Sequence, residues 1–215
     1  MKDYEAYLFD WDGTLACTAE IWLEEIKRQL HAEGIGVSDA DNARHLGDFF
    51  GWFKELGLSN ERANTLAEQV IQAARQRLPQ ALLYDIAADM LGELQGRGKK
   101  VGLITSSGAG SLTLVMDRYN IRHLFDAIVT GDDVTHIKPD PEGILLALDK
   151  LQVRPPQAVM LGDTHNDILA AHNAGIHSAL FYPDTHKLIY DFEELQSHRP
   201  THTIHHWQEL LDQLS

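Results

Sequence analysis

One stretch near the start of the chain decides the fold, Tyr7-Leu8-Phe9-Asp10-Trp11-Asp12-Gly13-Thr14. Its first three residues extend an apolar run from Ala6, which predicts a short buried strand. The polar residues that follow predict a turn, and Gly13 permits the backbone conformations that a tight turn requires. Asp10 and Asp12 therefore leave the end of a buried strand together.

Two carboxylates this close disfavour double ionisation unless a cation lies between them, so Asp10 and Asp12 suit a divalent cation. Such a cation would leave one carboxylate as a nucleophile and free the other for proton transfer. The alternative for an Asp-x-Asp pair is an Asx-turn that closes the strand.

Apolar runs and helical patterns alternate along the second half of the chain. Strands are predicted at 100–104, 127–130, 158–161 and 177–181, with a shorter one at 201–204. Helices are predicted at 87–96, 112–119, 141–151, 168–173 and 209–214. This alternation predicts an α/β fold built on a parallel sheet with right-handed crossovers.

The segment from Ala19 to about Pro79 has a helical pattern throughout and no strand signal. Short helices are predicted on both sides of Gly47-Asp48, and a longer one runs from an N-cap at Ser59 or Asn60 toward Arg77. We therefore predict a helical cap domain over residues 17–80, inserted into a catalytic core of residues 1–16 and 81–215.

Three further polar clusters lie near strand ends. Thr105-Ser106-Ser107-Gly108 offers a hydroxyl and free backbone N–H groups, which suit an anion, or else it is a helix N-cap. Lys138 precedes Pro139 and could neutralise a phosphate, or else it is a surface lysine before a proline-initiated helix. Asp163 and Asp167 could face one oxygen-preferring cation such as Mg²⁺, or else they are first-turn acids of a helix.

The order of these clusters favours a shared site. Ligands bind at the carboxyl ends of the strands in a parallel sheet, where all four clusters would meet. Independent helix caps would not need to supply a nucleophile, a hydroxyl, a lysine and metal-binding acids in that sequence.

Composition limits the partners. The formal net charge of −14 disfavours a polyanion such as nucleic acid, and no apolar run is long enough to cross a bilayer. The single cysteine, Cys17, excludes an intrachain disulfide, and no signal-peptide pattern is present, so we expect a cytoplasmic protein. The oligomeric state, monomer or homodimer, stays open.

These residues resemble the motifs of the haloacid dehalogenase-like hydrolases, in the branch with a helical cap that is similar to phosphoglycolate phosphatases. The likeness runs from about Tyr7 to Phe181. The four motifs are carried by Asp10-Trp11-Asp12-Gly13-Thr14, Thr105, Lys138-Pro139 and Gly162-Asp163-Thr164-His165-Asn166-Asp167. The resemblance implies a Rossmann-like core, a mobile cap and a magnesium-dependent phosphatase acting on a small phosphorylated metabolite.

The resemblance also implies roles for the motif residues. Asp10 would attack phosphorus, Asp12 would handle the protons, and Lys138 would offset negative charge. Thr105 and the amide of Ser106 would hold the phosphoryl oxygens. The predicted metal ligands are Asp10, the backbone carbonyl of Asp12, Asp163 and, directly or through water, Asp167.

The four motifs say less about the cap residues and do not exclude two competing activities. Arg44 and Gly47 resemble a cap segment that faces the substrate, where Arg44 would meet a second anionic group; the alternative is a solvated helix face. A sugar phosphomutase would use the same Asp10 and Asp12, and a catalytically inert phosphate-binding protein would keep the fold. For His202, His205 and His206 we expect a polar surface, and for Cys17 a packing role.

Overall fold

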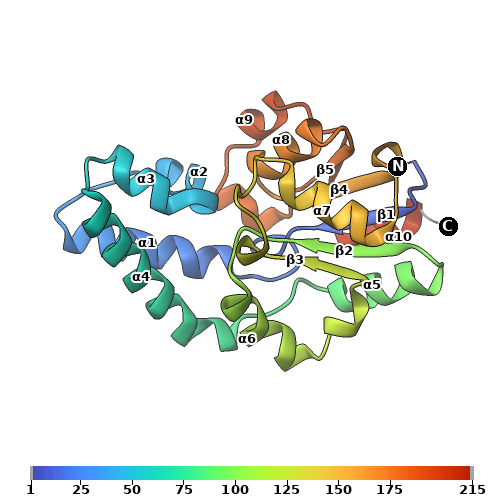
Figure 1. Cartoon of the computed structure of the whole chain (residues 1–215), viewed down its shortest axis with the longest axis horizontal. Helices are drawn as coiled ribbons and strands as arrows, with labels where there is room; N and C mark the ends of the chain where they lie inside the picture. The colour runs from blue at the N-terminus through green and yellow to red at the C-terminus, as the bar shows by residue number, and fades with distance from the viewer. Residues whose placement is uncertain (1, 214–215) are drawn as a thin grey trace.

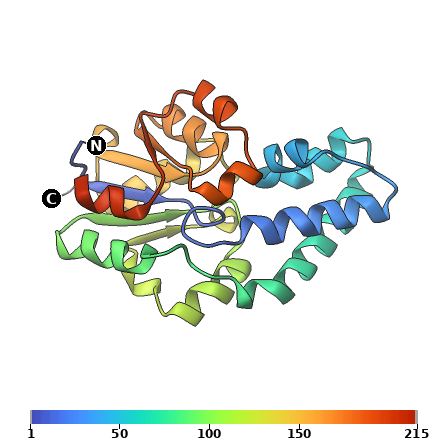
Figure 2. The same cartoon turned by 180° about the vertical axis from the view of Figure 1, so that it is seen from behind.

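The computed structural model of the protein describes residues 2–213, which form one parallel sheet with helices on both of its faces (Figures 1 and 2). The strand order is β3-β2-β1-β4-β5-β6. The strands are β1 Ala6–Phe9, β2 Lys100–Ile104, β3 Ala127–Val129, β4 Ala158–Gly162, β5 His177–Phe181 and β6 His202–Ile204. The chain builds outward from β1 on one side and then from β4 on the other, which confirms the predicted Rossmann-like α/β fold.

Helices cover the two faces of the sheet unequally. Helices α5 (Ala87–Gly96), α6 (Ala109–Tyr119) and α10 (Trp207–Gln213) pack on one face. Helices α7 (Glu142–Leu151) and α8 (His165–Asn173) pack on the other, as Figure 1 shows. The central strands are therefore shielded from water on both sides, as expected for parallel strands that are apolar throughout.

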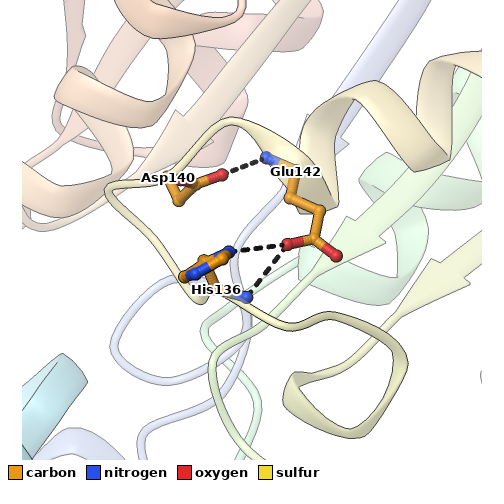
Figure 3. Close-up of side chains that lie close together, drawn as sticks. All are labelled: His136, Asp140 and Glu142. Carbon is orange, nitrogen blue, oxygen red and sulfur yellow. Dashed lines mark hydrogen bonds and ion pairs between the residues drawn. The ribbon is translucent and has the colours of Figure 1, made fainter.

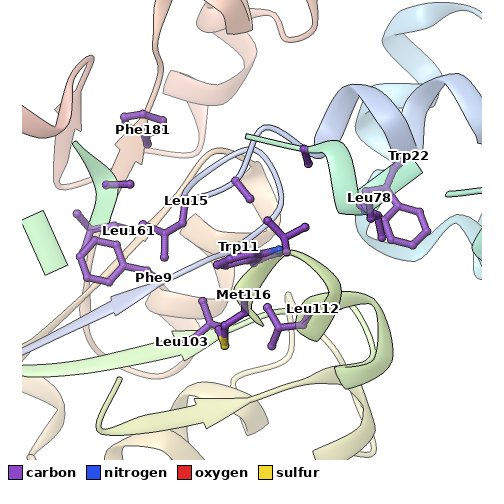
Figure 4. Close-up of a cluster of buried hydrophobic side chains, with 14 of the residues drawn as sticks. Phe9, Trp11, Leu15, Trp22, Leu78, Leu103, Leu112, Met116, Leu161 and Phe181 are labelled. Atoms are coloured by element: carbon purple, nitrogen blue, oxygen red, sulfur yellow. The ribbon is translucent and has the colours of Figure 1, made fainter. Parts of the chain in front are cut away.

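The alternation of side chains along β1 sets the direction of the residues that follow it. Phe9 belongs to the core on one face of the sheet, and Leu8 belongs to the core on the other. Trp11 is fully buried with Phe9, and Figure 4 shows it beside Leu112 and Met116 of α6. The aspartates on either side of Trp11 are thereby held at the strand end while the indole anchors the turn in the core.

Four helices between β1 and α5 extend beyond the carboxyl ends of the strands (Figure 1). They are α1 (Ala19–Ala32), α2 (Asp39–Arg44), α3 (Phe49–Glu55) and α4 (Asn60–Arg77). The longest, α4, begins where predicted, because the Ser59 hydroxyl accepts the N–H of Arg62 at 3.2 Å.

Helices α1 and α4 pack side by side through apolar faces and through ion pairs at their ends. The buried Glu25 of α1 accepts hydrogen bonds from Arg28 at 2.7 Å and from Arg77 of α4 at 3.1 Å. Arg77 also pairs with Glu24 at 2.7 Å, and near the other end of α4, Arg62 pairs with Glu33.

The structure differs from the sequence prediction mainly at helix starts. Helix α6 begins three residues before the predicted 112, and α8 begins three before the predicted 168, because polar first turns carry no apolar periodicity. Helix α9 (Phe192–Ser197), capped by Asp191, was missing from the prediction. The last residue of the predicted 209–214 helix lies outside the described residues. Within residues 2–213, no helix is both long enough and apolar enough to span a membrane.

Candidate active site

The strand register brings the predicted motif residues to one rim of the sheet. Phe9 of β1 pairs with Leu103 of β2 and with Leu161 of β4. Asp10, Thr105 and Asp163 therefore emerge from three neighbouring strands at almost the same level. This rim lies where the strand order reverses between β1 and β4, which is the usual place for a ligand in such a sheet.

Three buried carboxylates gather at this rim. One oxygen from each of Asp10, Asp163 and Asp167 lies within 4.8 Å of the others. Oδ1 of Asp163 accepts the Thr14 hydroxyl at 2.9 Å, whereas its buried Oδ2 has no hydrogen bond of ordinary geometry. The buried Tyr190 hydroxyl interacts with Asp163 electrostatically without forming such a bond. An unsatisfied buried carboxylate oxygen among other carboxylates fits a cation-binding site.

The pKa values indicate the same need for positive charge. Burial raises the pKa of Asp10 to about 7, the Lys138 ammonium opposes this shift, and the charge of Asp167 adds to it. Burial, followed by the charges of Asp10 and Asp167, raises the pKa of Asp163 well above its usual range. A divalent cation in this cluster would allow all three carboxylates to stay ionised.

Two glycines make room for the cluster. Gly13 has a φ of +82°, and a Cβ there would lie 2.3 Å from Oδ2 of Asp163. A Cβ on Gly162 would lie 2.2 Å from Cγ of Asp167. Any larger residue at either position would displace a carboxylate of the site.

Lys138 reaches the site as predicted, and it is buried. Its Nζ donates to Oδ1 of Asp10 at 2.5 Å, to Oδ1 of Asp167 at 2.6 Å and to the carbonyl of Ile104 at 3.1 Å. Burial opposes the charge on this ammonium, but the two carboxylates raise its pKa overall. Lys138 is therefore a permanent cation directly beside Asp10.

Asp167 serves the helix and the site together. Its Oδ2 accepts the N–H of Thr164 at 3.0 Å and the Thr164 hydroxyl at 2.7 Å, which is a capping box at the start of α8. Its Oδ1 faces Lys138. The predicted first-turn role of Asp167 is thus confirmed, and its role as a metal ligand stays a prediction.

The Asp12 carboxylate is held apart from the acidic cluster by three donors. Oδ1 accepts the Thr18 hydroxyl at 2.6 Å and the indole N–H of Trp22 at 2.8 Å, and Oδ2 accepts the Ser107 hydroxyl at 2.7 Å. The sequence analysis did not assign roles to Trp22 or Thr18, although they lie four residues apart and so on one side of a helix start. Trp22 connects α1 directly to a carboxylate of the site.

A cavity of about 360 Å³ opens over these residues. Asp10, Asp12, Thr105, Ser106 and Lys138 line it from the sheet side. The segment from α1 to α4 contributes the opposite wall, which consists of Trp22, Leu46, Gly47, Phe49, Ile71 and Arg75. The predicted phosphate-binding residues and Gly47 therefore share one cavity.

Arg44 does not join them. It is exposed at the end of α2 and is absent from the cavity lining, so the structure does not support the expected contact between Arg44 and the substrate. Arg75 is the arginine that the tertiary structure brings to the cavity. Its position on α4 carries no motif, so the sequence offered no signal for it.

A second group of potential metal ligands, His136, Asp140 and Glu142, lies outside the cavity lining (Figure 3). Glu142 accepts the N–H groups of Thr135 and His136, both at 2.9 Å, and its own N–H donates to Asp140. These contacts organise the loop and the first turn of α7, which explains the cluster without a metal.

The C-terminal histidines contact neighbouring residues separately. His202 hydrogen-bonds the Tyr4 hydroxyl at 3.0 Å, and Nδ1 of His205 lies 2.8 Å from the carbonyl of Tyr182. No group of metal ligands within residues 2–213 includes them.

Comparisons with known proteins agree with this site. A family model described as haloacid dehalogenase-like hydrolase matches residues 7–181. Pyrophosphatase PpaX of Bacillus cereus strain Q1 is 31% identical over 178 residues, which cover 80% of each chain. A hydrolase from Pseudomonas syringae superposes with a TM-score of 0.86 at 26% identity, covering 98% of this chain and 97% of the other.

A candidate phosphoglycolate phosphatase from Lactobacillus plantarum shares the fold, with a TM-score of 0.84, 22% identity, and coverage of 98% of this chain and 99% of the other. The matched family segment contains all four motifs, from Asp10 to Asp167. The chain is therefore an enzyme that belongs to the haloacid dehalogenase-like hydrolase family.

Proposed function

We propose that this protein is a magnesium-dependent phosphatase that hydrolyses a small phosphorylated metabolite through an aspartyl phosphate on Asp10. The observation that carries the proposal is the contact of Asp10 with Lys138 at 2.5 Å inside a group of buried carboxylates facing the cavity. The relative from Bacillus cereus is a pyrophosphatase, which supports chemistry at phosphorus.

The donor set suits Mg²⁺, because it consists of oxygen atoms. Asp10 and Asp163 would hold the ion together with the backbone carbonyl of Asp12. The bonds that Asp167 already makes to Lys138 and Thr164 favour its contribution through water. When bound, the ion would supply positive charge that neutralises the phosphoryl oxygens.

In the first step, an oxygen of Asp10 forms a bond to phosphorus, and the bond from phosphorus to the leaving oxygen breaks. Lys138 stabilises the ionised form of Asp10 and the charge on the phosphate. The Thr105 hydroxyl and the Ser106 amide bind the phosphoryl oxygens. Asp12 gives its proton to the leaving oxygen, which departs as an alcohol or an acid.

In the second step, Asp12 takes a proton from water as the water oxygen attacks phosphorus. The bond between phosphorus and Asp10 breaks, and the carboxylate is restored. The donors around Asp12 fit this double role unequally. The hydroxyls of Thr18 and Ser107 can rotate to accept a hydrogen bond from the protonated Asp12 carboxyl, whereas the indole of Trp22 can only donate one.

The segment from α1 to α4 forms the wall of the cavity opposite the phosphate-binding residues. We propose that residues 17–80 act as a cap domain over a core of residues 1–16 and 81–215. The cap would exclude water during the first step and select the part of the substrate that leaves. The single cysteine supports a cytoplasmic setting.

The test measures phosphate release from p-nitrophenyl phosphate and from a panel of phosphorylated metabolites, with Mg²⁺ and with EDTA. Turnover should require Mg²⁺ and should disappear in Asp10→Asn. The matched control is Asp140→Asn, which changes an aspartate of the second acidic cluster and should stay active. Full activity in EDTA or in Asp10→Asn would refute the proposal.

Two other outcomes identify the alternatives. Isomerisation of a sugar phosphate without net release of phosphate would assign the protein as a phosphomutase, which uses the same two aspartates. Tight phosphate binding without turnover on the whole panel would assign it as an inert binding protein.

A further inference from the structure

Arg75 is placed in the catalytic cavity by the helical wall rather than by any motif. It lies one turn after Ile71 on α4, and both residues line the cavity. Residues four apart share one side of a helix, so this side of α4 faces the substrate. Figure 1 shows the end of α4 approaching α6.

The bonding of Arg75 differs from that of the other arginines on α4. Arg62 pairs with Glu33, and Arg77 pairs with Glu24 and Glu25. Arg75 instead donates to the backbone carbonyl of Gly110 at 3.1 Å, and no ion pair within residues 2–213 involves it. Most of its five N–H donors and its full charge are therefore available to a ligand.

The other charged groups of the cavity lining are already engaged. Lys138 is bound to Asp10 and Asp167, and the Asp12 carboxylate has its three donors. Asp132 also lines the cavity, but its Oδ2 accepts the N–H of Ala109 at 2.9 Å. Arg75 is thus the one cation among the described lining residues that lacks a carboxylate partner.

We propose that Arg75 binds a second oxyanion of the substrate, so that the enzyme acts on small phosphate compounds that also carry a carboxylate or another phosphate. This inference rests on the proposed phosphatase function and adds the substrate class. Thr105, Ser106 and Lys138 take the phosphoryl group that is transferred. Arg75 takes the far end of the molecule with the planar, bidentate geometry that guanidinium offers to carboxylate and phosphate.

The size and lining of the cavity limit the spacer between the two anionic groups. A volume of about 360 Å³ lies near the lower end of the range for ligand cavities, which favours a small compound. Trp22, Leu46, Phe49 and Ile71 supply apolar surface between the charged ends. Arg75 thereby performs the role that the sequence analysis had assigned to Arg44.

The test compares phosphoglycolate and inorganic pyrophosphate, which carry a second anion, with ethylene glycol monophosphate, which replaces the carboxylate by a neutral alcohol. In Arg75→Gln, the ratio of kcat/KM for phosphoglycolate to that for ethylene glycol monophosphate should fall by about 10- to 100-fold. Arg75→Lys should restore part of the ratio. Arg44→Gln, which removes an exposed arginine outside the cavity, should keep the wild-type ratio.

A structural role for Arg75 would have a different signature. If its bond to Gly110 only held α4 against α6, Arg75→Gln would lower kcat/KM equally for both compounds, and the inference would be overturned. If neither the phosphoglycolate ratio nor the corresponding pyrophosphate ratio changed, each taken relative to ethylene glycol monophosphate, the inference would be overturned as well. Pyrophosphate distinguishes a second carboxylate from a second phosphate as the group that Arg75 binds. If Arg75 binds phosphate alone, Arg75→Gln should lower kcat/KM selectively for pyrophosphate and not for phosphoglycolate.

A binding measurement separates this inference from the proposed function. Titration calorimetry in Mg²⁺ compares the affinities of phosphoglycolate and ethylene glycol monophosphate for two full-length variants. These are Asp10→Asn and the double variant Asp10→Asn/Arg75→Gln. If the wild type turns over none of the compounds but Arg75→Gln abolishes the preference for binding phosphoglycolate, the phosphatase function is refuted and the anion site is supported. If the wild type turns over these compounds but Asp10→Asn binds phosphoglycolate no more tightly than ethylene glycol monophosphate, the anion site is refuted.

Discussion

Replacing Lys138 by methionine tests how the site tolerates its buried negative charge. The methionine fills a similar volume but removes the ammonium that contacts Asp10 at 2.5 Å and Asp167 at 2.6 Å. The two carboxylates and Asp163 would then remain buried together without a positive neighbour from the chain. The lysine and both of its partners are at most 9% exposed, so water cannot replace the lost ion pairs.

The expected loss of stability follows from this burial. Removing one partner of a buried ion pair costs about 3–5 kcal/mol, because an uncompensated charge is left behind. Lys138 serves two carboxylates, so we expect the upper part of that range in EDTA. Mg²⁺ should bind the variant more tightly than the wild type and should reduce the difference, because a ligand stabilises the folded state according to its affinity.

Urea unfolding followed by tryptophan fluorescence measures this effect, since all four tryptophans are buried. The curves for the wild type, Lys138→Met and the double variant Lys138→Met/Asp167→Asn should be recorded in EDTA and in Mg²⁺. The double variant should recover part of the loss by removing one unpaired charge. Lys150→Met, at an exposed lysine, should change the free energy of unfolding by less than about 0.5 kcal/mol. A loss below about 1 kcal/mol for Lys138→Met in EDTA would refute the reasoning.

Three further predictions concern the groups that support the site. Trp22→Phe removes the N–H that positions the Asp12 carboxyl and should lower kcat/KM for ethylene glycol monophosphate about tenfold more than for p-nitrophenyl phosphate, whose leaving group needs little protonation; equal losses in steady-state assays would contradict this. Gly13→Ala forces a Cβ against Asp163 at a φ of +82° and should lower the free energy of unfolding by at least about 1 kcal/mol, together with the affinity for Mg²⁺ measured by calorimetry; unaltered metal binding would argue against the crowding. Burial opposes ionisation of Glu25, but hydrogen bonds from its two arginine partners lower its pKa overall. Its stabilisation is therefore present above the unfolded pKa of about 4.3 and is lost as the pH falls through the folded value; Glu25→Gln should be less stable than the wild type by about 1 kcal/mol at pH 7 in urea unfolding, and a gap that persists at pH 3 would exclude the ion pairs as its source.

The core of the fold was predictable because its signals are local. The apolar run before Asp10 and the runs that became β2, β4 and β5 each predict a buried strand within a few residues. The Ser59 cap predicts the start of α4 for the same reason, since a cap bond spans three residues. Once the strands are parallel, their carboxyl ends must share a rim, and Asp10 and Asp163 must approach each other.

The sequence by itself thus determined the α/β fold, the strand ends and the residue types gathered there, because these follow from local periodicity and from one rule of sheet geometry. Only the tertiary structure decided which side chains meet across long separations: that Trp22 and Ser107 hold Asp12, and that Arg75 faces the cavity in place of Arg44. The physical reason is that a helix face acquires its direction from packing. The rotation of α4 against α1 and α6 turns one unmarked arginine toward the cavity and leaves its neighbours to pair with glutamates.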